Sequence, residues 1–234
     1  MEGLREIWFL KSTSSFCSMK TEMLSIPVSD SIGTVSAEIM SEKGINFLFV
    51  FAHGAGAGMN HPFMVNLATA LLGLKIGTLR YNFPFMEKGK NRPDPPAIAE
   101  KTVLQAIDFA RDKFPKTPLL AGGKSFGGRM TSQAISKSPH PSVKGLVFTG
   151  FPLHAPGNPG TDRANHLASI SIPMLFLQGT RDALANILLM EKICADHASA
   201  TLKKFEGADH SFKAGKQDLI PPLAEAIRDW TLNL

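Results

Sequence analysis

The hydrophobic pattern of this chain alternates between short apolar runs and longer stretches with apolar residues at helical spacing. Residues 45–52 are almost continuously apolar and aromatic, which is typical of a strand covered on both faces. Shorter apolar runs predict further strands at 76–81, 118–122, 143–149, 173–178 and 201–205. Between them, the spacing predicts helices over 62–72, 96–113, 126–137, 183–195 and 218–230.

Near the amino end the pattern is different. Two weakly alternating runs, 23–28 and 33–40, are separated by turn-forming residues, which favours a hairpin at a sheet edge. The rest of the chain alternates strands with helices, which predicts an α/β fold with a mostly parallel, doubly wound sheet and helices on both faces. Two irregular segments, 84–95 and 151–168, follow predicted strands. We therefore expect both at the carboxyl edge of the sheet, where open α/β sheets bind ligands.

Composition limits the possible classes of protein. The 234 residues are 44% hydrophobic and 19% charged, which predicts one compact domain over 21–234. Residues 1–20 are predicted to be a disordered extension, or partly an overlong start of translation before Met19 or Met23. Only Cys17 and Cys194 are present, which excludes a disulfide framework and fits a cytoplasmic location.

Charge and hydropathy give two further expectations about partners. The net charge is +5, but the densest basic stretch, 88–92, is five residues long and lacks interleaved aromatic residues. It indicates a solvated loop rather than a nucleic-acid surface. No apolar run approaches the ~20 residues that span a bilayer, and residues 7–10 are too short for a secretory core. We expect neither a nucleic-acid nor a membrane partner.

The strongest chemical motif is G-x-S-x-G at residues 123–127, where an apolar run gives way to a predicted helix. A sharp strand-to-helix turn exposes the serine hydroxyl at the carboxyl end of a sheet, and flanking glycines allow that turn. Ser125 is therefore the candidate nucleophile. A serine hydroxyl is weakly nucleophilic near neutral pH, so it needs a base, and the base needs an orienting group.

Asp182 and His210 are the candidate partners of Ser125, because each lies just after a predicted strand. The chain order Ser, Asp, His is the one that this hydrolase architecture requires. Alternatives stay open: Asp182 as the N-cap of the following helix, and His210 as an ordinary loop histidine. The competing side chains are less well placed; they are Asp162, Asp209, His53, His61 and His154.

An acyl-transfer site also needs N–H donors for a developing oxyanion. The backbone N–H of Phe126, directly after the serine, is one candidate. The second should come from the loop after the strand at 47–51, the small-residue segment 53–58, in which we assign Ala55. The alternative is a glycine-rich turn without any ligand contact.

Two nucleotide-binding interpretations use the same glycines. A phosphate-binding P-loop would need glycine where Pro118 stands, which excludes it. Gly54, Gly56 and Gly58 resemble a dinucleotide fingerprint whose last gap is one residue short. No acidic residue ends the next strand, although Arg80 there could meet a 2′-phosphate, so a reductase stays a minor alternative. The histidines show no metal-ligand spacing, and we expect neither a metal nor a cofactor.

With these motifs the chain resembles the α/β-hydrolase superfamily, and more closely its small, lidless group related to testis-expressed protein 30 and to a hydrolase-like domain of a chromatin-complex subunit. The matching segments are 52–60, 122–129, 151–154 and 207–211, within roughly residues 45–232. The resemblance implies an eight-stranded, mostly parallel sheet, a Ser/Asp/His triad and no lid domain. Dienelactone-hydrolase-like enzymes share the compact build but use cysteine at the position of Ser125.

Four further residues are predicted to line a substrate pocket: His53, Lys124, Arg129 and His154. Lys124 either faces an acidic group of the substrate or is solvated, and Arg129 lies one helical turn beyond Ser125. The sequence thus predicts a carboxylesterase- or thioesterase-like serine hydrolase that acts on a small acyl substrate in a shallow, open pocket. The alternative is a non-catalytic interaction module that has kept the hydrolase framework. Oligomeric state is not specified by these patterns.

Overall fold

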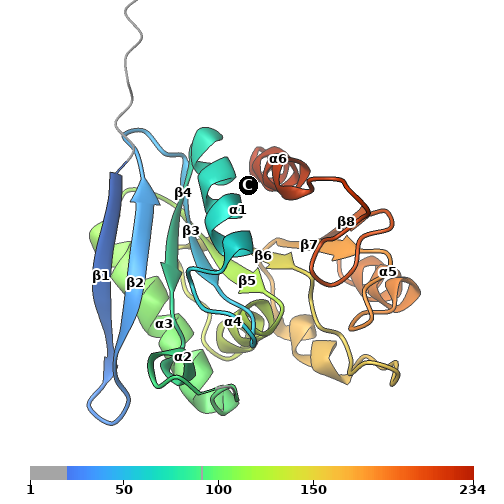
Figure 1. Cartoon of the computed structure of the whole chain (residues 1–234), viewed down its shortest axis with the longest axis horizontal. Helices are drawn as coiled ribbons and strands as arrows, with labels where there is room; N and C mark the ends of the chain where they lie inside the picture. The colour runs from blue at the N-terminus through green and yellow to red at the C-terminus, as the bar shows by residue number, and fades with distance from the viewer. Residues whose placement is uncertain (1–19, 91) are drawn as a thin grey trace, which may run out of the picture.

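The structure is a computed structural model that describes residues 20–90 and 92–234. Within them, eight strands form one sheet in the order β1-β2-β4-β3-β5-β6-β7-β8 (Figure 1). The strands are β1 (Lys20–Ser29), β2 (Gly33–Ser41), β3 (Phe47–Ala52), β4 (Ile76–Tyr81), β5 (Leu119–Lys124), β6 (Val143–Thr149), β7 (Met174–Gly179) and β8 (Ala200–Phe205). The disordered extension predicted for residues 1–20 lies outside the described residues, except for Lys20, which begins β1.

Helices cover both faces of this sheet. They are α1 (Pro62–Gly73), α2 (Pro84–Glu87), α3 (Pro96–Lys113), α4 (Phe126–Lys137), α5 (Ile187–Asp196) and α6 (Ile220–Thr231), with a 3-10 helix η1 at Asp162–Ser169. Figure 1 shows α1 beside α6. Buried residues of these two helices share one hydrophobic cluster, and those of α3, α4 and α5 share another. The predicted α/β architecture, an eight-stranded, mostly parallel sheet between helices, is the observed fold.

Strand direction brings the functional segments to one edge. β2 runs antiparallel to β1 and β4, whereas the pairings from β4 through β3, β5, β6 and β7 to β8 are parallel. The carboxyl ends of β3, β5, β7 and β8 therefore meet at the same edge of the sheet. The loop 53–58, Ser125, Asp182 and His210 each follow one of these four strand ends.

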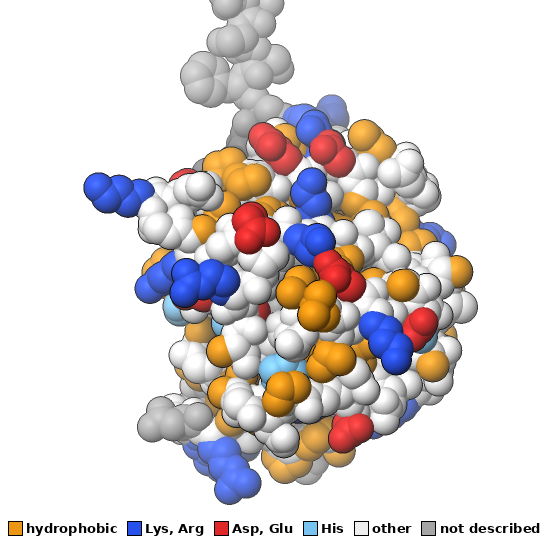
Figure 2. Space-filling view, turned by 90° about the vertical axis from the view of Figure 1, so that its right-hand side faces the viewer, with side chains coloured by type: hydrophobic (Ala, Val, Ile, Leu, Met, Phe, Trp, Pro, Cys, Tyr) orange, Lys and Arg blue, Asp and Glu red, His pale blue; other side chains and the backbone are white. Residues whose placement is uncertain are grey.

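The predicted elements match the structure closely, with a few informative differences. The helix predicted from residue 183 begins at Ile187, because Asn186 caps it with its side chain and leaves 182–186 as a loop. The strand predicted to end at 122 continues to Lys124, so the nucleophile candidate follows the strand directly. The segments predicted as irregular contain α2 and η1. On the face seen in Figure 2, basic and acidic side chains are interspersed.

Candidate active site

Ser125 occupies a strained turn between β5 and α4. Its backbone has φ 49° and ψ −114°, a region that non-glycine residues rarely adopt. The turn packs closely against its neighbours, since a Cβ atom at Gly123 would lie 2.3 Å from the carbonyl oxygen of Ala52. A Cβ atom at Gly127 would lie 2.5 Å from the carbonyl oxygen of His53. The glycines of the motif are therefore required by the backbone packing that exposes the serine.

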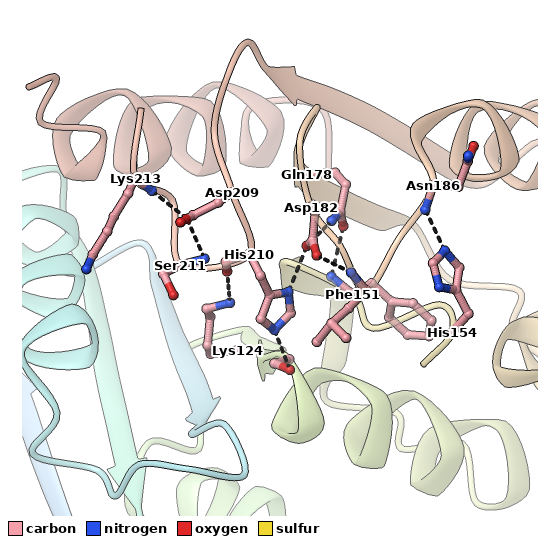
Figure 3. A network of polar contacts seen from close by, with 12 residues as sticks. Lys124, Phe151, His154, Gln178, Asp182, Asn186, Asp209, His210, Ser211 and Lys213 are labelled. Atoms are coloured by element: carbon pink, nitrogen blue, oxygen red, sulfur yellow. Dashed lines mark hydrogen bonds and ion pairs between the residues drawn. The ribbon is translucent and has the colours of Figure 1, made fainter. Parts of the chain in front are cut away.

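The structure brings Ser125, His210 and Asp182 into one chain of hydrogen bonds (Figure 3). His210 Nδ1 lies 2.7 Å from Asp182 Oδ2, and its Nε2 lies 2.8 Å from Ser125 Oγ. A carboxylate only accepts hydrogen bonds, so Nδ1 carries the proton and Nε2 accepts from the serine hydroxyl. This tautomer is the one that can take a proton from Ser125.

The carboxylate of Asp182 is fully buried, whereas a quarter of the His210 side chain is exposed. Gln178 Nε2 donates to the same Oδ2 at 2.6 Å, and the backbone N–H of Leu184 donates to Oδ1 at 2.7 Å. Asp182 is thus not the N-cap of α5, which is Asn186. The competing carboxylates lie elsewhere: Asp209 accepts from backbone N–H groups of its own turn, and Asp162 begins η1.

The loop after β3 presents its backbone beside the serine. A Cβ atom at Gly54 would lie 3.8 Å from that of Ser125. Within the described chain, the backbone N–H groups of Ala55 and Phe126 have no hydrogen-bond acceptor. The end of the loop nearer α1 is fixed, because Met59 N–H donates to Asn82 Oδ1 and Arg80 donates to the Met59 carbonyl. Two free N–H groups are therefore available on a fixed backbone.

His53 is predicted to line the substrate pocket, but this prediction is wrong. It is completely buried and does not line the cavity beside Ser125. Its Nδ1–H donates to Gly54 O at 2.7 Å, and its Nε2 accepts from the backbone N–H of Phe83 at 3.0 Å. Burial lowers the pKa of His53 to about 4, so the ring is neutral near pH 7. It fastens the loop after β3 to the end of β4.

A cavity of about 380 Å³ opens beside Ser125. Its walls come from the loop after β3, the start of α1, the strand end of β5 and the loops after β7 and β8; they are Gly54, Ala55, Gly56, Ala57, His61, Phe63, Met64, Lys124, Ser125, Leu184, His210 and Ser211. Larger grooves lie elsewhere on the described chain, and the two largest of these, of about 570 and 690 Å³, lie along β8 with α6 and between η1 and α5. Neither is lined by Ser125, Asp182 or His210, so the smaller cavity is the one connected to the chemistry.

Two other predicted pocket residues also lie outside the cavity. His154 accepts from the backbone N–H of Asn186 at 2.8 Å and donates to Ala155 O, so it fastens the loop that carries Asp182 (Figure 3). Arg129 faces η1, where burial first and Arg163 second lower its guanidinium pKa. Lys124 does line the cavity, but its Nζ is engaged by the His210 carbonyl at 2.5 Å rather than offered to an acidic substrate.

The structure also describes the groups on which binding of a dinucleotide, a metal ion or a membrane would depend. Arg80 is 1% exposed and forms an ion pair with Glu38, so its guanidinium is not available to a 2′-phosphate. Among residues 20–90 and 92–234, no three His, Cys, Asp or Glu side chains gather as metal ligands would. None of the helices in that part of the chain has the length and apolar character required to cross a membrane.

Comparison with known proteins identifies the family. The sequence profile of the alpha/beta hydrolase domain matches residues 46–220, three quarters of the chain. The chain belongs to this α/β-hydrolase family. Membership in the narrower group related to testis-expressed protein 30 stays a prediction.

Solved structures share this fold at low sequence identity. Dienelactone hydrolase from Anabaena variabilis is 19% identical, with a TM-score of 0.76 over 92% of this chain and 98% of that chain. An α/β serine hydrolase without a lid from Xanthomonas campestris is 18% identical, with a TM-score of 0.72 over 90% and 95%. Est1E from Butyrivibrio proteoclasticus is 14% identical, with a TM-score of 0.68 over 90% and 98%. At such identities the likeness shows the α/β-hydrolase fold.

The sequence analysis does not predict the buried partner of Asp182 or part of the cavity wall. Gln178 connects the Asp182 carboxylate to the backbone N–H of Phe151 and is fully buried. A buried amide at the end of an otherwise apolar strand was the available signal. Leu184, Phe63 and Met64 line the cavity but had no distinguishing pattern, because apolar residues at such positions are common in any core.

Proposed function

We propose that this protein is a serine hydrolase that cleaves a small ester or thioester through an acyl-enzyme intermediate. The observation that carries the proposal is the continuous hydrogen-bonded chain from buried Asp182 through His210 to Ser125, ending at an accessible cavity. A non-catalytic module requires none of these three side chains in this arrangement. The hydroxyl, the base and the orienting carboxylate are those of acyl transfer.

The reaction follows from the protonation states that the geometry supports. Ser125 Oγ attacks the carbonyl carbon of the substrate while His210 Nε2 takes the hydroxyl proton. The resulting oxyanion accepts hydrogen bonds from the N–H groups of Phe126 and Ala55, and Asp182 stabilises the imidazolium. The tetrahedral intermediate then collapses, and His210 returns the proton to the departing alkoxide or thiolate. Water, activated by the same imidazole, releases the acid and regenerates Ser125.

The cavity supports a small and uncharged acyl group. Its volume of about 380 Å³ lies at the lower end of the range for small-molecule sites. Phe63, Met64 and Leu184 supply apolar walls, and the loop 54–57 supplies small residues. The cation in its wall, Lys124, is hydrogen-bonded to the protein itself, which disfavours a substrate selected by a carboxylate.

Replacement of the nucleophile tests the proposal. We expect Ser125→Ala to abolish hydrolysis of p-nitrophenyl acetate, because water alone must then attack the bound ester. The fold should persist, as judged by circular dichroism and thermal unfolding. Ser138→Ala is the matched control, since Ser138 is exposed at the far end of the same helix. Equal turnover by the Ser125 variant and the wild type would reject the proposal and favour the non-catalytic module.

A further inference from the structure

Lys124, the residue before the nucleophile, contacts the main chain of the catalytic histidine candidate. Its Nζ donates to the carbonyl oxygen of His210 at 2.5 Å, while Ser125 Oγ reaches the imidazole of the same residue at 2.8 Å (Figure 3). Two consecutive residues at the end of β5 therefore contact the main chain and the side chain of the same histidine.

The surroundings of this ammonium group fit a permanent attachment. It lies 5.8 Å from the ring centroid of Phe63 and 5.4 Å from that of Phe212, within the range of cation–π attraction. Gly150 leaves space for it, because a Cβ atom there would lie 2.9 Å from Nζ. Phe63 comes from α1, Gly150 follows β6 and Phe212 follows β8, so three segments enclose the side chain.

Burial and nearby charges shift the pKa of Lys124 in opposite directions. Burial lowers the pKa of Lys124 to about 8, and the nearby carboxylates of Asp182 and Asp209 oppose that shift. Asp182 follows β7 and Asp209 follows β8, and His210 contributes its main-chain carbonyl to the direct contact. A protonated lysine gives a charge-assisted hydrogen bond to the carbonyl, which is roughly twice as strong as a neutral one.

The loop that carries His210 is otherwise fixed mainly within itself and to the loop after β7. Asp209 Oδ1 accepts from the backbone N–H groups of Ser211 and Lys213, and Arg181 N–H donates to Ala208 O. The hydrogen bond between Ser125 and His210 cannot serve as a constant tie to β5. It is lost whenever the serine is acylated, whereas the contact between Lys124 and the His210 carbonyl takes no part in the chemistry.

We propose that Lys124 is a positioning residue that keeps the imidazole of His210 aligned with Ser125 throughout the catalytic cycle. This inference rests on the proposed serine hydrolase function and goes beyond it, because it assigns a role to a side chain that touches no reacting atom. It also gives the enzyme an alkaline limit. As Lys124 loses its proton above about pH 8, the attachment weakens and turnover falls.

The test compares Lys124→Met with Lys213→Met. Methionine keeps the unbranched side chain and removes the donor and the charge. Lys213 lies in the same loop, is exposed, and its side chain points away from His210 (Figure 3). With p-nitrophenyl acetate we expect kcat of Lys124→Met to fall by up to ~10²-fold, the cost of a misplaced catalytic group, with KM nearly unchanged. We expect the wild type and Lys213→Met to lose activity above about pH 8, and Lys124→Met to lack that limb.

Wild-type kcat in Lys124→Met, or an alkaline limb that persists in it, would overturn the positioning role. Should that variant not fold, Lys124→Arg takes its place, and a retained kcat without the alkaline limb is then the supporting result. The proton resonance of His210 Nδ1–H gives a readout that does not depend on turnover. A sharp signal in the wild type that broadens in Lys124→Met supports positioning even if no ester is hydrolysed, which would reject only the proposed function.

Discussion

At the scale of single residues, Asp182 is the side chain whose charge can be tested with least change of shape. Asparagine in its place can still accept the hydrogen bond from Leu184 N–H, but its amide no longer fixes the Nδ1–H tautomer of His210. We expect Asp182→Asn to lower kcat by about 10⁴-fold, the loss known for this change in the Ser-His-Asp template. Steady-state kinetics measures it, with Asp162→Asn as control. A loss below tenfold would contradict the role assigned to Asp182.

Several side-chain contacts at the site could not be predicted from the sequence. The meeting of Ser125, Asp182 and His210 could be predicted because a turn motif and strand ends mark these residues locally. The contacts of His53, His154 and Lys124 could not, because each bonds to a backbone group that lies far away in the sequence. A histidine or lysine beside a motif looks available to substrate, whereas packing determines which way its side chain points.

At the scale of elements, the close approach of α4 to β3 makes a direct prediction. A methyl group at Gly127 would lie 2.5 Å from the His53 carbonyl oxygen, so Gly127→Ala requires the helix to move. We expect a loss of about 1–3 kcal/mol in the free energy of unfolding, with lower activity because Ser125 directly precedes that helix. Chemical denaturation measures the first effect.

Gly73→Ala is the matched control, as Gly73 lies in α1 with nothing within 4 Å of the added Cβ atom. This variant should be neutral or slightly stabilised, because alanine favours helix by up to about 1 kcal/mol. Equal destabilisation by the two variants would show that the packing of the turn is not what requires Gly127.

Most elements could be predicted from the sequence because local patterns determine them. The helix at 96–113 and the strand at 143–149 have the predicted bounds. The start of α5 was wrong by four residues, because Asp182 and Ala183 are compatible with a helix, yet Asp182 binds His210 and Asn186 forms the cap. Where a loop carries the site, tertiary hydrogen bonds override local propensity.

At the scale of the whole molecule, buried titratable groups predict how stability depends on pH. Burial lowers the pKa of His53 and of His166 to about 4, from 6.5. Between these values the unfolded chain binds more protons than the folded one, so the free energy of unfolding falls as pH is lowered from 6.5 to 4. Burial also lowers the pKa of Lys124 from 10.5 to about 8. Between pH 8 and pH 10.5 the unfolded chain again binds more protons, so the free energy of unfolding rises with pH in this range.

Urea denaturation across both windows measures these slopes. Glutamine in place of His166 removes one titration while keeping a partner for Ser132, so His166→Gln should show a shallower acid slope than the wild type. An unchanged slope would contradict the assignment of His166 as a half-buried neutral group.

The proposed function requires that His210 and Asp182 activate Ser125 as a nucleophile. The most direct measurement is labelling of the native protein with a fluorophosphonate, followed by intact-mass analysis and peptide mapping. We expect one adduct per chain, on Ser125, that is absent in Ser125→Ala and formed much more slowly in Asp182→Asn. A folded wild-type protein that stays unlabelled, or that carries the adduct on another residue, would reject Ser125 as the activated nucleophile.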